Sequence, residues 1–190
     1  MGAMPATPTM TADEFIALPH APELRFAELV AGELVVDPPR ARHQLIAGDL
    51  MYHVMSWVRG GQGRGSVWFD LGLRLDEHNV FQPDLLWYPA GMRLDLDATI
   101  HPLPAIAAEI RSPSTWRYDI GAKKAAYERE GLRELWLVDS AADGLLIFRR
   151  SRPDAPAFDM AVELERPDVL TSSLLEGFEL PLVELFKPAR

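Results

Sequence analysis

The sequence contains no cysteine, no long apolar run and no excess of basic residues. The absence of cysteine excludes disulfides and thiolate metal sites, so burial of apolar side chains must stabilise the fold, as is common in the reducing cytoplasm. No apolar run approaches the roughly 18–20 residues that span a bilayer, and the N-terminus lacks a basic region followed by an apolar one. We therefore predict a cytoplasmic protein.

Acidic residues outnumber basic ones by 28 to 19, which gives a formal net charge of −9 at pH 7. Proteins that coat nucleic acid need clustered lysine and arginine, so this balance disfavours a general nucleic-acid binder. The basic residues are grouped, however, and a local basic surface would still admit nucleic acid. One group comprises Arg111, Arg117, Lys123, Lys124, Arg129 and Arg133, and the other comprises Arg40, Arg42, Arg59 and Arg64.

Two common catalytic motifs are missing as well. The glycine-rich stretch GGQGRG at residues 60–65 lacks the Lys-Ser/Thr ending with which nucleoside triphosphatases bind phosphate. The Gly-x-Ser-x-Gly motif of serine hydrolases does not occur either. The sequence therefore argues against both of these enzyme classes.

The 190 residues, 48% of them hydrophobic, suffice for one core. We expect a disordered N-terminus over residues 1–10 and a single domain over residues 11–190. The order of helical and strand periodicities is typical of the α/β (α+β) class: a central mixed β-sheet flanked by helices, with an N-terminal helix and β-hairpin. The expected helices cover residues 11–18, 42–59 and 115–130, and the expected strands fall within residues 24–39, 66–89, 103–112, 134–150 and 158–164.

Two apolar patterns predict where side chains are buried. Phe69, Leu71, Leu73 and Leu75 alternate with polar residues, which predicts one strand with a single buried face. The C-terminal segment over residues 170–186 is also apolar. It could pack back on the core or against a partner.

Two carboxylates stand at unusual places in apolar segments. Asp84 follows Pro83 at the entry to the run LLWY, and Glu109 lies inside the run AIAAEI. A carboxylate buried in a strand is costly unless it is paired or bound to a metal. If the two strands pair, both carboxylates could hold Mg²⁺, which prefers oxygen ligands and keeps several waters. The alternative for Asp84 is a cap on the turn after Pro83.

Lys123 lies within the helix predicted over residues 115–130. A lysine beside two metal-binding carboxylates would orient the attacking water or neutralise charge on a phosphate. The alternative is a solvated lysine on an exposed helix face, since Lys124 follows it directly. The pattern alone leaves both interpretations open.

The spacing Asp84-(x24)-Glu109-x-Arg111 resembles the PD-(D/E)xK signature of restriction-endonuclease-like nucleases. A longer series of motifs resembles one family of that superfamily, the Uma family of bacterial endonucleases. The resemblance runs from Thr11 to Phe186. Its motifs here are ELVAGELV, His43, PDLLWYP, AEIRSPST, Asp119 with Lys123 and Tyr127, GLRELWLVD and LEGFELPLVELF.

The resemblance implies a restriction-endonuclease-like core and an endonuclease, dependent on Mg²⁺ or Mn²⁺, that hydrolyses DNA by in-line attack of a metal-activated water. Asp84 and Glu109 would be the metal ligands and Lys123 the catalytic lysine. The superfamily usually has its lysine two positions after the second acid, where this chain has Arg111, whereas the Uma-type pattern uses the lysine on the following helix. Arginine is not a base in proteins, but it can contact a phosphate.

Further candidates complete the predicted site. Glu28 matches another acid of the family, and it and His43 are candidate metal ligands. The alternatives are a solvent-facing strand residue for Glu28 and a helix cap for His43. Ser112, Ser114 and Thr115 are expected to cap the following helix or to contact phosphate.

Three functions compete on this sequence. The leading one is a metal-dependent DNA endonuclease. The alternatives are a catalytically inactive nuclease-fold module for binding or assembly, favoured by the acidic balance and by Arg111, and a phosphodiesterase acting on RNA or nucleotides. Cutting both DNA strands needs two sites, so we also predict a homodimer, with the apolar C-terminal segment as its surface.

Overall fold

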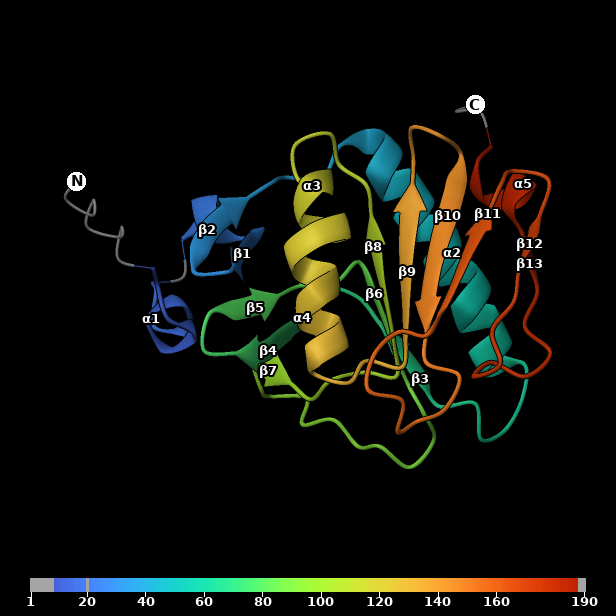
Figure 1. Ribbon diagram of the computed structural model, residues 1–190, viewed down its shortest axis with the longest axis horizontal. Coiled ribbons are helices and arrows are strands. Elements are labelled where there is room, and N and C mark those ends of the chain that lie inside the picture. Colours follow the sequence, from blue (N-terminus) through green and yellow to red (C-terminus); the bar gives the residue numbers. More distant parts are fainter. Residues whose placement is uncertain (1–8, 20, 188–190) are drawn as a thin grey trace.

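The computed structural model describes residues 9–19 and 21–187. Figure 1 shows two large sheets, with helices packed around the six-stranded one. Most of the disorder predicted over residues 1–10 falls outside the described residues. Met10, however, takes part in the fold, because its N–H donates to the carbonyl of Gly32 at 3.0 Å. Within the described residues, no helix is both long and apolar enough to cross a membrane.

The main helices lie close to their predicted positions. The first begins after Thr11, whose side chain and that of Glu14 form a reciprocal capping box. The helical stretch predicted over residues 115–130 ends before Gly131. The φ of Gly131 is 89°, the left-handed conformation that is common after a helix. The helical elements are α1 (Ala12–Ile16), η1 (Pro22–Leu24), α2 (Ala41–Arg59), α3 (Trp116–Tyr118), η2 (Asp119–Lys123), α4 (Lys124–Arg129) and α5 (Leu182–Leu185).

The strands form a six-stranded, a five-stranded and a two-stranded sheet. In chain order they are β1 (Ala27–Val30), β2 (Glu33–Val36), β3 (Ser66–Trp68), β4 (Gly72–Asp76), β5 (Asn79–Phe81), β6 (Leu85–Tyr88), β7 (Ile100–His101), β8 (Ile106–Ile110), β9 (Glu134–Asp139), β10 (Gly144–Arg149), β11 (Met160–Leu164), β12 (Val169–Leu170) and β13 (Leu180–Pro181).

The six-stranded sheet, in the order β11-β10-β9-β8-β6-β3, carries the main core. β8 and β9 run parallel at its centre, and the other neighbours are antiparallel. α2 packs on one face through Ile46, Leu50 and Val54. α4 covers the opposite face with Ala126 and Tyr127. Because both faces are covered, β8 is buried along its whole length, as its continuous apolar sequence predicted.

The five-stranded sheet has the order β2-β1-β5-β4-β7 and includes the predicted N-terminal hairpin. Its turn is Ala31-Gly32, where both residues have positive φ, 52° and 78°, as the tight turn of a two-residue hairpin requires. β5 belongs to this sheet and β6 to the larger one, and only residues 82–84 connect them. Asp84 therefore stands at the junction of the two sheets.

The prediction of strand, turn and strand over residues 66–89 was wrong in detail. This stretch forms β3, β4, β5 and β6, which divide between the two sheets. The chain leaves β3 at Phe69, and Asp70 has a φ of 53°. Leu73 and Leu75 are buried as the alternation predicted, but Phe69 is 62% exposed. The alternation of buried and exposed residues breaks between β3 and β4, because these two strands belong to different sheets.

The apolar C-terminal segment packs back on the core of the six-stranded sheet. Phe178 stacks on Trp136 with ring centroids 6.2 Å apart, and Leu180, Leu182 and Leu185 are fully or almost fully buried. Most of the segment's large apolar side chains are therefore covered within the chain, and Val183, which is 46% exposed, is an exception.

The loop before β3 approaches β6 closely at Gly65. Its φ is 72°, and an added Cβ would lie 2.0 Å from the carbonyl oxygen of Tyr88. Gly63 has a similar φ of 70° but open space around its Cα, so Gly63→Ala is a matched control. We expect Gly63→Ala to cost about 1–2 kcal/mol through backbone strain alone, and Gly65→Ala a further 1–3 kcal/mol or so through overpacking. Urea unfolding of both variants measures the difference, and equal losses would contradict this packing.

Candidate functional site

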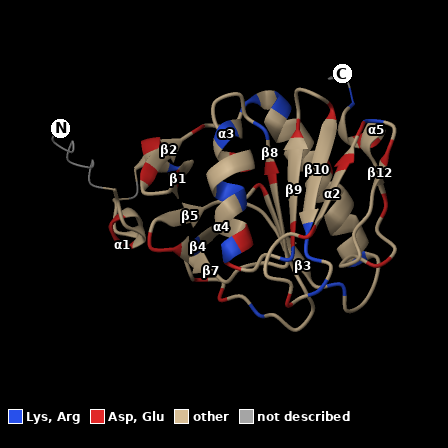
Figure 2. Ribbon diagram, viewed as in Figure 1, with Lys and Arg blue, Asp and Glu red and all other residues tan. Residues whose placement is uncertain are grey.

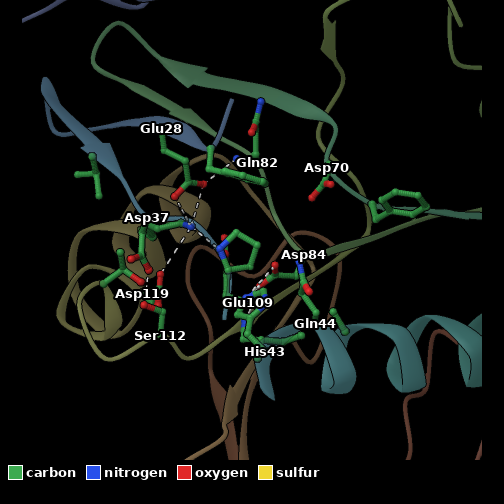
Figure 3. Close-up of a pocket in the computed structure, with 18 of the residues that line it drawn as sticks. Glu28, Asp37, His43, Gln44, Asp70, Gln82, Asp84, Glu109, Ser112 and Asp119 are labelled. Carbon is green, nitrogen blue, oxygen red and sulfur yellow. Dashed lines mark hydrogen bonds and ion pairs between the residues drawn. The ribbon is translucent and has the colours of Figure 1, made fainter. Parts of the chain in front are cut away.

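One cleft lies where the two large sheets meet, and its cavity has a volume of about 360 Å³. It is lined from β1, from the start of α2, from the linker between β5 and β6, from β8 and from η2. Figure 3 shows carboxylates from several of these elements pointing toward one another. Most of the site residues predicted from the sequence line it: Glu28, His43, Asp84, Glu109, Ser112, Thr115 and Lys123.

Strand pairing brings Asp84 and Glu109 together. β6 pairs with β8 in antiparallel fashion, with Leu85 opposite Ala108, so the preceding Asp84 lies beside the following Glu109. The N–H of Ile110 donates to Asp84 Oδ2 at 2.7 Å, which fixes that carboxylate against β8. Asp84 therefore does not serve as a cap on its own turn, the alternative reading of the sequence.

His43 holds Asp84 from the opposite side. It lies in the first turn of α2, and its Nε2 is 3.1 Å from Asp84 Oδ1 and 3.2 Å from Oδ2. Burial lowers the pKa of His43, but the hydrogen bond to Asp84 and the charge of that carboxylate outweigh burial, so the pKa is raised above its ordinary value. A histidine that donates to a carboxylate positions it, and the same nitrogen is then not free to bind a metal.

A π-helical segment delivers Lys123 and Asp119 into the cleft. η2 interrupts the helix between α3 and α4, and such single π-turns change which side chains face inward. Both side chains are nearly fully buried. Lys123 Nζ lies 2.7 Å from Glu109 Oε2, 3.0 Å from both carboxylate oxygens of Glu28 and 3.6 Å from Asp119 Oδ1. Lys123 is therefore not the solvated lysine on an exposed helix face that the sequence left open as an alternative.

The buried charges perturb one another strongly. Burial raises the pKa of Glu109 well above its usual range, although the nearby Lys123 charge opposes this. Burial would lower the pKa of Lys123, but the charges of Glu109, Glu28 and Asp119 raise it well above its ordinary value. Burial likewise raises the pKa of Asp119 to about 6. Tyr127 donates its hydroxyl to Glu109 Oε1 at 2.7 Å. The lysine thus stays charged and shares several carboxylates.

Arg111 lies outside the cleft lining. Its Nη1 donates to both carboxylate oxygens of Asp139 at 2.9 Å, and its guanidinium stands over the Trp116 ring, 5.3 Å from the centroid. This side chain is therefore held by the end of β9. The phosphate contact that the sequence suggested has no support in this geometry.

The serines after β8 do not cap the following helix as predicted. Ser112 Oγ donates to Asp37 Oδ2, and Ser114 Oγ donates to Asp37 Oδ1 at 2.7 Å. The residue before α3 is Thr115, whose side chain makes no capping bond. Asp37, the residue after β2, accepts hydrogen bonds from both serine hydroxyls. The hydroxyls therefore do not cap the helix.

Several cleft residues were missed by the sequence reasoning. Asp37 fell within the strand region predicted over residues 24–39 and was not singled out, and Asp119 entered only as one position of a family motif. Phe69 was expected on a buried strand face rather than in a cleft. Four polar residues gave no local signal that marked them as cleft residues: Arg25, Gln44, Asp70 and Gln82.

The donor set of the cleft fits a hard divalent cation. Six carboxylates line it against two basic side chains. Each carboxylate oxygen of Asp84 and Glu109 has two lone pairs, so the contacts described above leave acceptor positions for an ion. Within residues 9–19 and 21–187, no group of three acidic or histidine side chains has the geometry of a preformed metal site. Two carboxylates suffice for Mg²⁺, because this ion keeps several waters as ligands.

Comparison with known proteins identifies the family. The model of the Uma2 family, described as "Putative restriction endonuclease", matches residues 12–183. The chain belongs to the Uma2 family. The resemblance inferred from the motifs is thereby confirmed. No curated protein sequence matches this Uma2 chain.

A solved structure shows the same fold. The crystal structure of "a putative nuclease belonging to DUF820" from Anabaena variabilis superposes with a TM-score of 0.75 at 19% sequence identity. The alignment covers 93% of the Uma2 chain and 97% of the other. At this identity the likeness concerns the fold alone. It confirms the predicted mixed α/β architecture, with a central sheet flanked by helices, as a nuclease-like fold.

Lys123→Met tests the buried charge cluster. Removing the ammonium leaves Glu28, Glu109 and Asp119 facing one another, and breaking a buried pair in this way costs about 3–5 kcal/mol. The folded-state pKa of Glu109 and Asp119 is already raised, and without Lys123 it rises further. Their protonated forms then stabilise the fold at low pH, and this stability is lost as pH rises through the folded pKa.

We therefore expect Lys123→Met to lower the free energy of unfolding, relative to the wild type, by more at about pH 8 than at about pH 5. Lys124→Met is the matched control, since Lys124 is more exposed and pairs with Glu128 only at 4.0 Å. Urea unfolding at both pH values measures the effect. A loss of stability that does not depend on pH, or one equal to that of Lys124→Met, would contradict the charge coupling described for Lys123 and its carboxylates.

Proposed function

We propose that this cleft hydrolyses phosphodiester bonds in DNA with the help of Mg²⁺ or Mn²⁺. The observation that carries the proposal is the convergence of Asp84, Glu109 and Lys123 from a strand start, an adjacent strand and a helix. Membership of the Uma2 family supports the same reading.

Charge supports the need for a metal. A phosphate group that approaches a cleft with six carboxylates and two basic side chains is repelled. Asp84 and Glu109 would hold a divalent cation, and a cation held there would polarise the phosphoryl group and lower the pKa of the attacking water. Electrostatics and membership of the family thus both support a requirement for the metal.

The protein's own groups have distinct roles in this proposal. Ile110 N–H and His43 hold Asp84 in one orientation. Tyr127 and Lys123 do the same for Glu109. The ammonium of Lys123 has three protons, and one of them would orient water for in-line attack or neutralise charge on the phosphate.

Metal binding can be measured without any cleavage. We expect MnCl₂ or MgCl₂ to raise the unfolding temperature of the wild type, because an ion that binds only the folded state stabilises it. Asp84→Asn and Glu109→Gln should abolish this shift. Glu134→Gln is the matched control, since Glu134 is also buried in a strand but bonds Trp136 and Ser172 outside the cleft. A shift retained by both cleft variants would contradict the assignment.

Cleavage tests the activity itself. With Mn²⁺ or Mg²⁺ the wild type should cut plasmid or oligonucleotide DNA, and Glu109→Gln or Lys123→Ala should lower the rate by about 100-fold or more, as loss of a charge-stabilising group does. Arg111→Met should keep most of the activity, because Arg111 pairs with Asp139 outside the cleft. Equal activity in the wild type and both cleft variants would refute the proposal, and a loss in Arg111→Met alone would restore its phosphate role.

One observation favours the second candidate, a nuclease-fold module that binds without cutting. Lys123 is 3% exposed, and three carboxylates surround its ammonium. A lysine held this firmly would be a structural cation rather than a catalytic one. Metal binding and DNA binding without cleavage in the assays above would select this candidate.

A further inference from the structure

The cleft has a second end that the proposed chemistry does not use. Figure 3 shows Asp70 beyond Asp84, on the side of the pocket away from Glu28 and Asp119. Phe69, Asp70 and Arg25 all line the pocket. Asp70 is close enough to both Asp84 and Arg25 to feel their charges. This end therefore adjoins the proposed metal ligands.

Phe69 presents an apolar ring at this end. It is 62% exposed, although it directly follows β3. The backbone explains the exposure, because the left-handed φ of 53° at Asp70 turns the chain out of the sheet there. Folding gains little from an aromatic ring left in water. In a cleft that takes a phosphodiester, an open ring face offers a stacking platform for a nucleobase.

Arg25 supplies a cation to the same pocket. It is solvent-exposed and stands over the Phe26 ring, 5.1 Å from the centroid. Within residues 9–19 and 21–187, Arg25 has no carboxylate at ion-pair distance. Its guanidinium is therefore available to a phosphate.

Three of the basic residues grouped in the sequence are already paired. Arg42 bonds Asp143 at 2.6 Å, Arg111 bonds Asp139 and Arg129 bonds Asp76, both at 2.9 Å. In Figure 2 the basic positions are spread over several elements and lie among acidic ones. A protein that follows duplex DNA neutralises many phosphates with free lysine and arginine. Among the described residues that line the pocket, only Arg25 and Lys123 are lysine or arginine, so stacking must contribute more to substrate binding.

We propose that Phe69 and Arg25 form a subsite for one unpaired nucleotide next to the scissile phosphate. The base stacks on the Phe69 ring, and the neighbouring phosphate meets the Arg25 guanidinium. The inference rests on the proposed phosphodiesterase function and names its substrate class: DNA with a single-stranded or frayed segment. The cavity of about 360 Å³ suits one nucleotide, because it lies at the low end of the range of about 300–1,000 Å³ for small-ligand pockets. On such a substrate one copy of the chain suffices, since only one strand is cut.

Base stacking can be followed with the fluorescent adenine analogue 2-aminopurine, which is quenched when it stacks. A single-stranded DNA that carries it is mixed rapidly with the full chain and Mn²⁺, and fluorescence is read before cleavage. We expect quenching by the wild type and by Phe69→Trp, and its loss in Phe69→Ala. Tyr52→Ala is the matched control, because Tyr52 is an aromatic residue that is 67% exposed on α2 but does not line the cleft.

Cleavage of single-stranded, frayed and fully paired DNA of one sequence completes the test. Phe69→Ala should bind and cut the first two about 10-fold less well, as alanine substitution of a stacking residue does. Arg25→Gln should weaken binding and reduce its dependence on salt. Unfolding temperatures of Phe69→Ala and Tyr52→Ala that match the wild type exclude misfolding.

The outcomes separate this inference from the proposed function. Cleavage with no preference for unpaired DNA, and with no effect of Phe69→Ala beyond that of Tyr52→Ala, would overturn the subsite and leave the nuclease assignment intact. Quenching that depends on Phe69, without cleavage of any DNA, would support the subsite and overturn the catalytic proposal. Quenching by RNA but not by DNA would overturn the assignment of the substrate as DNA.

Discussion

The contact between Lys123 and three carboxylates is the constraint on which the arrangement of this molecule depends. Glu28 comes from β1 of the five-stranded sheet, Glu109 from β8 of the six-stranded sheet and Asp119 from the helical layer. Burial of these charges is costly, and only mutual pairing offsets the cost. The cluster therefore forms only when both sheets and the helix take one relative position. That position creates the cleft.

Excess negative charge links this architecture to function. One lysine does not balance the carboxylates around it, so the cleft attracts cations and repels phosphates unless a cation is present. Hydrogen bonds from Ile110, His43 and Tyr127 hold the two central carboxylates in place. Such prior fixation would suit the metal-dependent hydrolysis proposed above, because carboxylates already held in place lose little conformational entropy on binding an ion. Phe69 and Arg25 extend the same cleft with groups suited to a base and a phosphate.

Much of the fold could be predicted, because its signals are local. The continuous apolar run around Glu109 correctly predicted a covered central strand, and the Thr11 capping box correctly predicted the first helix. The failures have a common cause. Phe69 was expected in a buried strand face, but the chain changes sheets there. Ser112 was expected to cap a helix, but Asp37, 75 positions away, takes its hydroxyl.

The sequence by itself determined that Glu109 would be a buried carboxylate, because an acid inside an apolar strand has to be paired or bound. Together with the family motifs it also identified Lys123 as the cation that meets it. Only the tertiary structure decided the partners. It placed Arg111 on Asp139 rather than in the cleft, and it brought Asp70, Phe69 and Arg25 to one end of the cavity. These contacts depend on which strands pair and on how the two sheets pack, and both bring together residues that are distant in the sequence.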